Sequence, residues 1–138
     1  MKNFVAENDP LCSYKGAMKT LGICRGNRCV PIRVEVARTP EQRAYGLMNR
    51  MFLPERTGML FVYPSAGYRS VWMKNTYVPL DVLFLSPLGV VLSIRQAYPH
   101  DLTSVGCSVA PSQYIIELPY DTCKRYGIRE GDQVVGIY

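Results

Sequence analysis

Lys74, Asn75 and Asp81 are side chains whose types and spacing could form a polar binding cluster. Asp81 comes directly before the apolar run 82–85, so we expect its carboxylate to be partly buried at the start of a strand. A partly buried carboxylate requires a cation or several hydrogen-bond donors. Lys74 or an arginine could supply the charge, and Asn75 a hydrogen bond. The cluster would then either contact a ligand in a cleft or form a structural network that fixes the loop 75–79, and we favour the network.

Two further residues are candidates for a binding site. Glu117 lies between Ile116 and Leu118 in a strand-like run, where it could pair with an arginine or act as a general base beside Asp81. Two carboxylates divide acid and base roles only if their environments separate their pKa values. Trp72 is the only tryptophan, and it is predicted either as a core residue or as a flat contact surface for a ligand.

These residues define a candidate ligand-binding set without a catalytic assignment. The set consists of Trp72, Lys74, Asn75, Asp81 and Glu117. His100 is the only histidine, which argues against a Ser-His-Asp triad and against a histidine-rich metal site. No glycine-rich phosphate loop follows a strand. We therefore expect no metal and no cofactor.

The chain contains five cysteines, an odd number that first suggests buried, reduced thiols. Cys24 and Cys29 flank a Gly-Asn pair that is typical of a hairpin turn, which would place their side chains on opposing strands. Reduced thiols are the first expectation for this pair, and a disulfide is the alternative in an oxidising setting. A zinc pair is the third alternative, but no second pair supplies the other two ligands.

Length and composition predict one ordinary globular domain of 138 residues, with 48% hydrophobic and 20% charged residues. The formal net charge is +5, and residues 1–33 carry +4 of it, from six cations and two anions. The cations are scattered, so nucleic-acid binding is not expected. A protein partner or self-assembly is the expected kind of interaction.

The first ten residues contain Glu7 and Asp9 where a signal peptide would need an apolar segment. No apolar run approaches the roughly 20 residues that span a bilayer. We therefore expect synthesis in the cytoplasm, a soluble protein and no membrane insertion.

Hydrophobic alternation and turn residues predict about eight strands and two short helices. Residues 1–18 show no clear period and are predicted to form an N-terminal arm, and residues 19–138 a single β domain. The first helix is expected to begin with a capping box at 39–42 and to run to about Met48. The second is expected at 121–126. The strands are expected at 19–24, 29–37, 58–63, 70–73, 81–86, 90–95, 114–118 and 134–138. This pattern favours a compact antiparallel sandwich or barrel.

The run Trp72-Met73-Lys74-Asn75-Thr76-Tyr77-Val78-Pro79-Leu80-Asp81 resembles the signature of domain of unknown function 192. Further motifs of that family follow in the same order, at residues 34–37, 39–43, 46–48, 58–62, 116–118, 127–128 and 131–132. The resemblance covers about residues 19–138 and implies a mostly-β, jelly-roll-like domain. It implies no reaction and no catalytic residue.

Two departures from the family pattern bear on function. Many relatives carry an export leader, which this chain lacks, and the chain adds an arm with its own cysteine. Both suggest a cytosolic or phage-encoded copy. The predicted function is a non-catalytic binding, structural or assembly module, for example a virion component. A small-ligand or carbohydrate-binding domain is one alternative, and an enzyme that uses Lys74, Asp81 and Glu117 is another.

Overall fold

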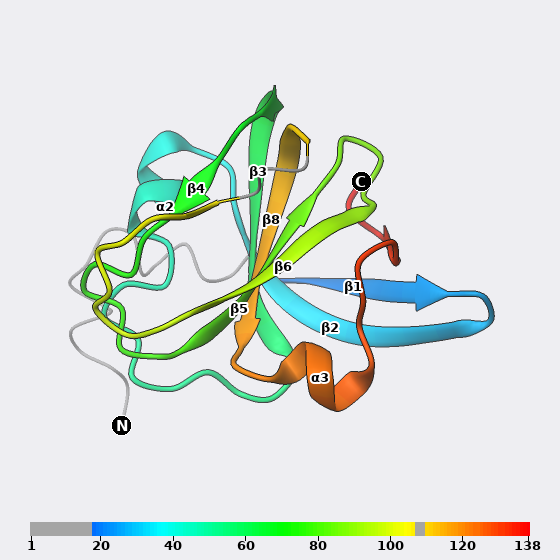
Figure 1. The fold of residues 1–138 in the computed structure, drawn as a ribbon, viewed down its shortest axis with the longest axis horizontal. Helices are drawn as coiled ribbons and strands as arrows, with labels where there is room; N and C mark the ends of the chain where they lie inside the picture. The colour runs from blue at the N-terminus through cyan, green and yellow to red at the C-terminus, as the bar shows by residue number, and fades with distance from the viewer. Residues whose placement is uncertain (1–17, 107–109) are drawn as a thin grey trace.

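A computed structural model describes residues 18–106 and 110–138 (Figure 1). These residues form nine strands and two short helices, which confirms the predicted mostly-β fold class. The predicted N-terminal arm lies outside the described residues apart from Met18. The strands are β1 (Met18–Arg25), β2 (Arg28–Ala37), β3 (Thr57–Gly67), β4 (Ser70–Val71), β5 (Leu80–Leu85), β6 (Val91–Ala97), β7 (Val105–Gly106), β8 (Ser112–Pro119) and β9 (Gln133–Val135). The helices are α2 (Pro40–Tyr45) and α3 (Thr122–Tyr126).

Seven strands form one mixed sheet in the order β6-β5-β8-β3-β2-β1-β9, and β4 pairs with β7 in a separate two-stranded sheet. All neighbours in the large sheet are antiparallel except β2 and β3, which are parallel. The sequence predicted antiparallel pairing throughout. The connection 38–56, which contains α2, accounts for the difference, because a parallel pair requires a crossover rather than a tight turn.

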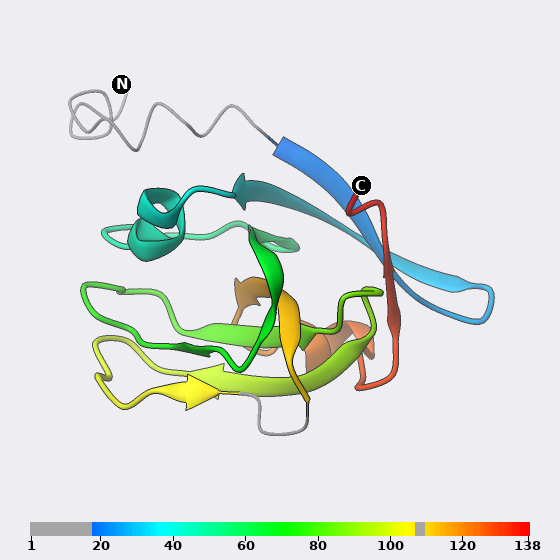
Figure 2. The same ribbon diagram turned by 90° about the horizontal axis from the view of Figure 1, so that it is seen from above.

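The two ends of the large sheet approach each other. A single bridge joins Val90 to Gln133, and the Val91 N–H donates to the Asp132 carbonyl over 2.9 Å. In Figure 2 the segment that holds β9 runs from the layer of β1 and β2 to the layer of β6. The ladder does not continue beyond this bridge, so the fold is a compact, sandwich-like curled sheet and not a closed barrel.

The strands β5 and β8 are buried on both faces, and the two faces of the large sheet contribute to separate hydrophobic cores. All six residues of β5 are buried because successive side chains point to opposite faces. Leu83 and Leu85 contribute to the first core, and Val82 and Phe84 to the second. The second core also includes Leu47, which follows α2, and residues of the loop and strands around β4 and β7. These covering segments lie at the end of the molecule away from the β1–β2 turn (Figures 1 and 2).

Both helices begin and end close to the predicted residues. The predicted capping box of α2 is present, because the Gln42 N–H donates to Thr39 Oγ1 over 3.1 Å and Gln42 Oε1 accepts from the Thr39 N–H. α2 ends at Tyr45, three residues earlier than predicted, where Gly46 takes a positive φ of 52°. Gly127 ends α3 in the left-handed conformation, as expected. No helix in the described ranges is long and apolar enough to cross a lipid bilayer.

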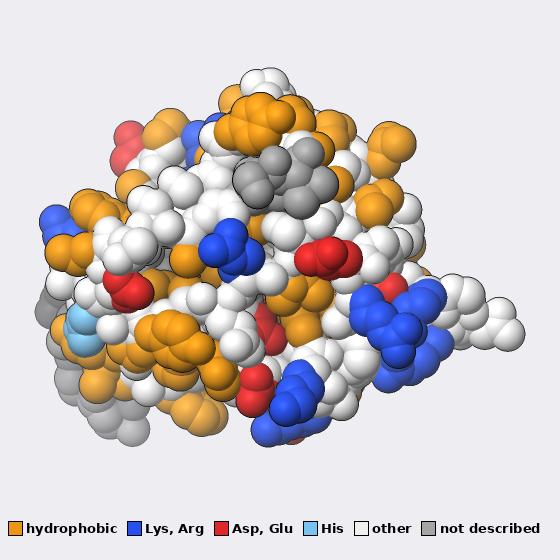
Figure 3. Space-filling view, in the orientation of Figure 1, with side chains coloured by type: hydrophobic (Ala, Val, Ile, Leu, Met, Phe, Trp, Pro, Cys, Tyr) orange, Lys and Arg blue, Asp and Glu red, His pale blue; other side chains and the backbone are white. Residues whose placement is uncertain are grey.

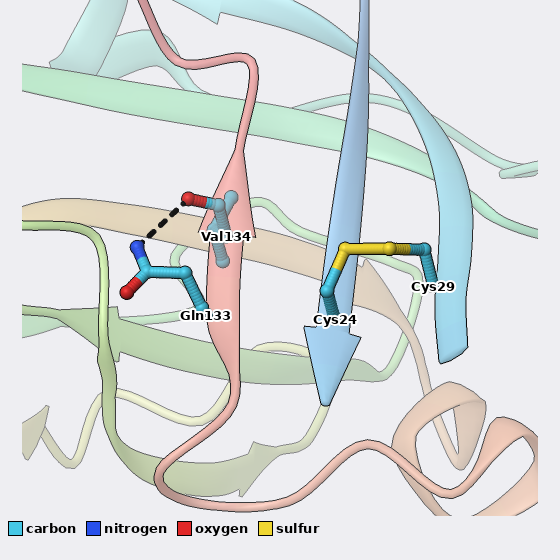
Figure 4. Close-up of a disulfide and its surroundings, with 4 residues drawn as sticks. All are labelled: Cys24, Cys29, Gln133 and Val134. Carbon is cyan, nitrogen blue, oxygen red and sulfur yellow. Dashed lines mark hydrogen bonds between the residues drawn. A yellow bond between two sulfur atoms is a disulfide. The ribbon is translucent and has the colours of Figure 1, made fainter. Parts of the chain in front are cut away.

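A disulfide joins Cys24 of β1 to Cys29 of β2, which face each other directly across the hairpin, with an S–S distance of 2.02 Å (Figure 4). Gln133 of β9 is paired with Cys24 on the other side of β1. Arg25 and Arg28, next to the turn, donate to the carbonyls of Gly127 and Tyr126 at the end of α3. The hairpin tip therefore satisfies helix-end carbonyls that would otherwise lack donors.

β3 and β8 approach closely at Gly58, and this approach generates a prediction. A Cβ atom at Gly58 would lie 1.8 Å from the Glu117 carbonyl oxygen, so Gly58→Ala would push the two backbones apart. We expect the free energy of unfolding, measured by urea denaturation, to fall by about 3 kcal/mol. The matched control is Gly67→Ala in the same strand, where the added Cβ would meet only the flexible end of Arg69. A similar loss in both variants would contradict the backbone explanation.

Candidate functional site

A cavity of about 240 Å³ lies between the second-core face of the large sheet and the segments that cover it. Phe61 and Tyr63 of β3 and Glu117 of β8 line it from the sheet. Residues 43–48, from α2 and the turn that follows, line it from a second direction. The remaining wall comes from residues 70–73 and Thr76, so the family-signature stretch contributes to this cavity.

Glu117 is the acidic residue of this cavity, and only 6% of its surface is exposed. Its cross-strand partners are Met59 in β3 and Val82 in β5, which are both buried and apolar. Within the described part of the chain, no residue donates a hydrogen bond to its carboxylate or forms an ion pair with it. Burial alone raises the pKa of Glu117 from 4.5 to about 7.

Arg43 is the cation among the lining residues, and its guanidinium is already engaged. It donates to the carbonyl oxygens of Val62, over 3.0 Å, and of Arg38. It also lies 4.7 Å from the centre of the Tyr63 ring, and the Arg69 guanidinium lies 3.9 Å from the same centre. Burial raises the pKa of Tyr63, so its hydroxyl group stays protonated at neutral pH. The Tyr63 ring therefore lies close to two guanidinium groups, of which Arg43 lines the cavity and Arg69 does not.

Asp81 is almost fully buried, with 1% of its surface exposed, and its carboxylate is fully engaged in holding α3. It accepts hydrogen bonds from the Asp121 N–H over 3.0 Å, the Cys123 N–H over 2.9 Å and Gln96 Nε2 over 3.3 Å. The N-cap residue Asp121 makes no capping bond with its own side chain. Asp81 therefore satisfies the first amides of α3 from a neighbouring strand. The network holds α3 rather than the loop 75–79.

The structure does not bring Lys74, Asp81 and Glu117 together. Asp81 is paired with Leu118 of the first core, whereas Glu117 is paired with Val82 of the second core. The two carboxylates therefore point to opposite faces of the sheet. Lys74 is exposed, and its ammonium nitrogen lies 5.5 Å from the centre of the Trp72 ring.

Trp72, Lys74 and Asn75 lie together at a second, more open hollow of about 310 Å³, with His100 and Leu102. The Trp72 ring is half exposed, and it lines both this hollow and the Glu117 cavity. Figure 3 shows hydrophobic side chains beside the histidine on this face. Asn75 takes a positive φ of 53°, and its carbonyl accepts a hydrogen bond from the Asn49 N–H over 2.9 Å.

Most residues of the cavity walls were not predicted from the sequence. Arg43 and Tyr45 belong to α2 and Tyr63 to β3, and nothing in the sequence marks them as neighbours of Trp72. The sequence signal that does point to this cavity is Glu117, a single glutamate within an otherwise apolar strand. Within residues 18–106 and 110–138, no cluster of three or more histidine, cysteine or acidic side chains could hold a metal ion.

The curled mixed sheet, with a buried acidic cavity on one face, defines a small mostly-β domain with a candidate binding site. The chain belongs to the family domain of unknown function 192 (DUF192), described as "Uncharacterized ACR", whose model matches residues 17–136. The resemblance inferred from the motifs is thereby confirmed.

Two crystal structures are similar to this chain in both fold and sequence. The first is a "putative transcription regulator" from Sinorhizobium meliloti 1021, with 36% identity and a TM-score of 0.83, and the match covers 87% of this chain and 94% of that one. The second is a protein of unknown function from Novosphingobium aromaticivorans DSM 12444, with 30% identity and a TM-score of 0.80, covering 85% and 84%. None of the curated proteins matches this chain in sequence.

The contacts of Asp81 generate a stability prediction. Asp81→Asn keeps the shape of the side chain but turns an amide nitrogen towards a backbone N–H donor, which leaves a buried donor unsatisfied. We expect a loss of about 3 kcal/mol in the free energy of unfolding, measured by urea denaturation. Gln96→Ala removes the longest of the three hydrogen bonds to Asp81, together with an exposed hydrogen bond to Asp121 Oδ1, and should cost only about 1 kcal/mol. An Asp81→Asn protein as stable as the parent would refute the structural role.

The buried carboxyl of Glu117 generates a pH prediction. The unfolded chain releases this proton near pH 4.5 and the folded chain near pH 7, so the folded state binds more protons between these values. The free energy of unfolding should therefore fall as the pH rises through this window, by about 3 kcal/mol, and level off above it. Glu117→Gln cannot ionise and should lack this contribution.

Urea denaturation at pH 5 and pH 8 measures the effect. The difference between the parent and Glu117→Gln isolates the contribution of Glu117 from that of other groups. Equal pH dependence in the two proteins would contradict a buried carboxyl whose pKa is raised.

Proposed function

We propose that this protein binds a small ligand in the Glu117 cavity. The observation that carries the proposal is the carboxyl of Glu117, which has no partner among the described residues, lies between buried apolar neighbours in the sheet and lines the cavity. A buried polar group normally has a hydrogen-bond partner, and those that lack one often belong to a functional site. A ligand that fills the cavity would supply the missing partner.

Binding is favoured over catalysis because the cavity lacks a recognisable reactive set. Ser70 and Thr76 line the cavity, but no histidine lies among its lining residues to activate a hydroxyl group. Asp81 does not share the cavity with Glu117, so the two carboxylates cannot act as an acid–base pair. Glu117 is therefore assigned a binding role.

The open hollow beside Trp72 supports a second candidate function, the binding of a carbohydrate or a protein partner. A half-exposed Trp72 ring next to Lys74, Asn75 and His100 offers a flat apolar surface with polar groups around it. Roles in assembly or in a virion stay predictions. The Sinorhizobium relative is described as a "putative transcription regulator", but the two helices in the described part of this chain have six and five residues and are separated by six strands, so they do not form a helix-turn-helix.

A fragment screen on the full chain tests the proposed function. Trp72 is the only tryptophan and lines the cavity, so its fluorescence should report fragments that bind there. We expect at least one fragment to shift the Trp72 emission with a saturable, millimolar or tighter affinity. Glu117→Leu, which replaces the carboxyl with an apolar side chain of similar size, should abolish the shift.

Lys74→Ala separates the two hollows, because Lys74 lines only the open one. This variant should still bind the fragment. If Glu117→Leu retained binding while Lys74→Ala lost it, the ligand would occupy the open hollow and the cavity would not be the binding site. A screen without any binding fragment would also refute the proposal.

A further inference from the structure

We propose that the ligand of the Glu117 cavity is a small organic cation with an ammonium group, bound by the Glu117 carboxylate between aromatic walls. This inference rests on the proposed function and specifies the chemical class of its ligand.

The charge of Glu117 has no counterpart in the described structure. A buried, ionised carboxylate is stable only beside a cation or several donors, and Glu117 has neither. Arg43, the cation among the lining residues, is directed to two carbonyls and the Tyr63 ring. A cationic ligand would supply the missing charge.

Glu35 provides a comparison within the same sheet. Glu35 and Glu117 lie on the same face, on either side of Met59, and both are buried. Glu35 forms a two-pronged ion pair with Arg50, with N–O distances of 2.7 and 2.8 Å. The fold thus neutralises one of two equivalent buried carboxylates with an arginine and leaves the other facing a cavity.

The walls of the cavity suit a cation. Tyr45, Phe61, Tyr63 and Trp72 contribute aromatic rings to the lining, and aromatic faces attract ammonium and guanidinium groups. The Tyr63 ring already has two guanidinium groups within 5 Å of its centre, at 4.7 and 3.9 Å. The aromatic walls and the carboxylate therefore favour the same sign of ligand charge.

Size and ligand number restrict the cation further. The volume of about 240 Å³ lies below the roughly 300–1,000 Å³ of drug-sized sites, which favours an amine with a few carbon atoms. A metal ion is a poor fit, because Ca²⁺ and Mg²⁺ need about six oxygen ligands and Glu117 is the single carboxylate among the described residues that line the cavity.

Three probes of similar size and different charge test the inference: n-butylammonium, n-butyramide and n-butyrate. Binding to the full chain is measured by Trp72 fluorescence and by the shift in Tm at pH 8.5. At this pH Glu117 is ionised, since its pKa is about 7, and the amine remains protonated, because alkylamines such as the lysine side chain titrate near about 10. We expect n-butylammonium to bind at least tenfold more tightly than n-butyramide, and n-butyrate to bind least.

Variants of Glu117 test whether this preference depends on its carboxylate. Glu117→Gln should bind n-butylammonium and n-butyramide about equally, whereas Glu117→Asp, which keeps the charge, should retain a weaker preference for the cation. Lys74→Ala should behave like the parent chain. The Tm of each variant without probe shows whether it is folded, and Glu117→Asp keeps the test decisive if Glu117→Gln does not fold.

Two results would overturn the inference in different ways. If the parent chain bound n-butyramide or n-butyrate as tightly as n-butylammonium, the ligand would not be a cation, and the proposed binding function would still stand. The same conclusion would follow if none of the three probes bound but fragments did. If neither probes nor fragments bound, the cavity would not be a binding site and both proposals would fail.

Discussion

Burial of β5 and β8 on both faces of the large sheet is the constraint on which the rest of this structure depends. Successive residues of β5 and β8 alternate between the two cores, so a polar side chain in the buried middle of either strand is shielded from bulk water. Asp81 and Glu117 are the acidic residues of these strands. Each carboxylate must therefore find partners inside the protein or face a cavity. Asp81 finds partners, and Glu117 faces a cavity.

The two carboxylates illustrate how the same group acquires different roles. Asp81 accepts two backbone N–H groups and a glutamine amide, so its charge holds α3 against the sheet. Glu117 lies one residue away from the partner of Asp81, on the opposite face, and lines a cavity without a described partner. The difference arises because α3 covers one face, whereas the covering segments on the other face leave a space next to Glu117. Asp81 stabilises the fold, and Glu117 is available to a ligand.

The fold class and most elements were predictable because they depend on local patterns. The capping box at Thr39 and Gln42 and the left-handed glycine at the end of α3 act within a few residues. The parallel pairing of β2 and β3 was missed because it depends on where the connection 38–56 crosses, which local periodicity does not encode. The two-residue strand β7 was missed because it is too short to show an alternation.

The sequence by itself determined the family, the mostly-β class and the presence of two acidic residues in apolar strands. It could not determine what those residues contact, because the partners of Asp81 lie 15 to 42 residues away and the walls of the Glu117 cavity come from five separate segments. Even the face to which each carboxylate points depends on the register between β5 and β8. Only the tertiary structure decided that Asp81 is satisfied and Glu117 is not, since hydrogen-bond partners and cavities are properties of packed segments rather than of sequence neighbours.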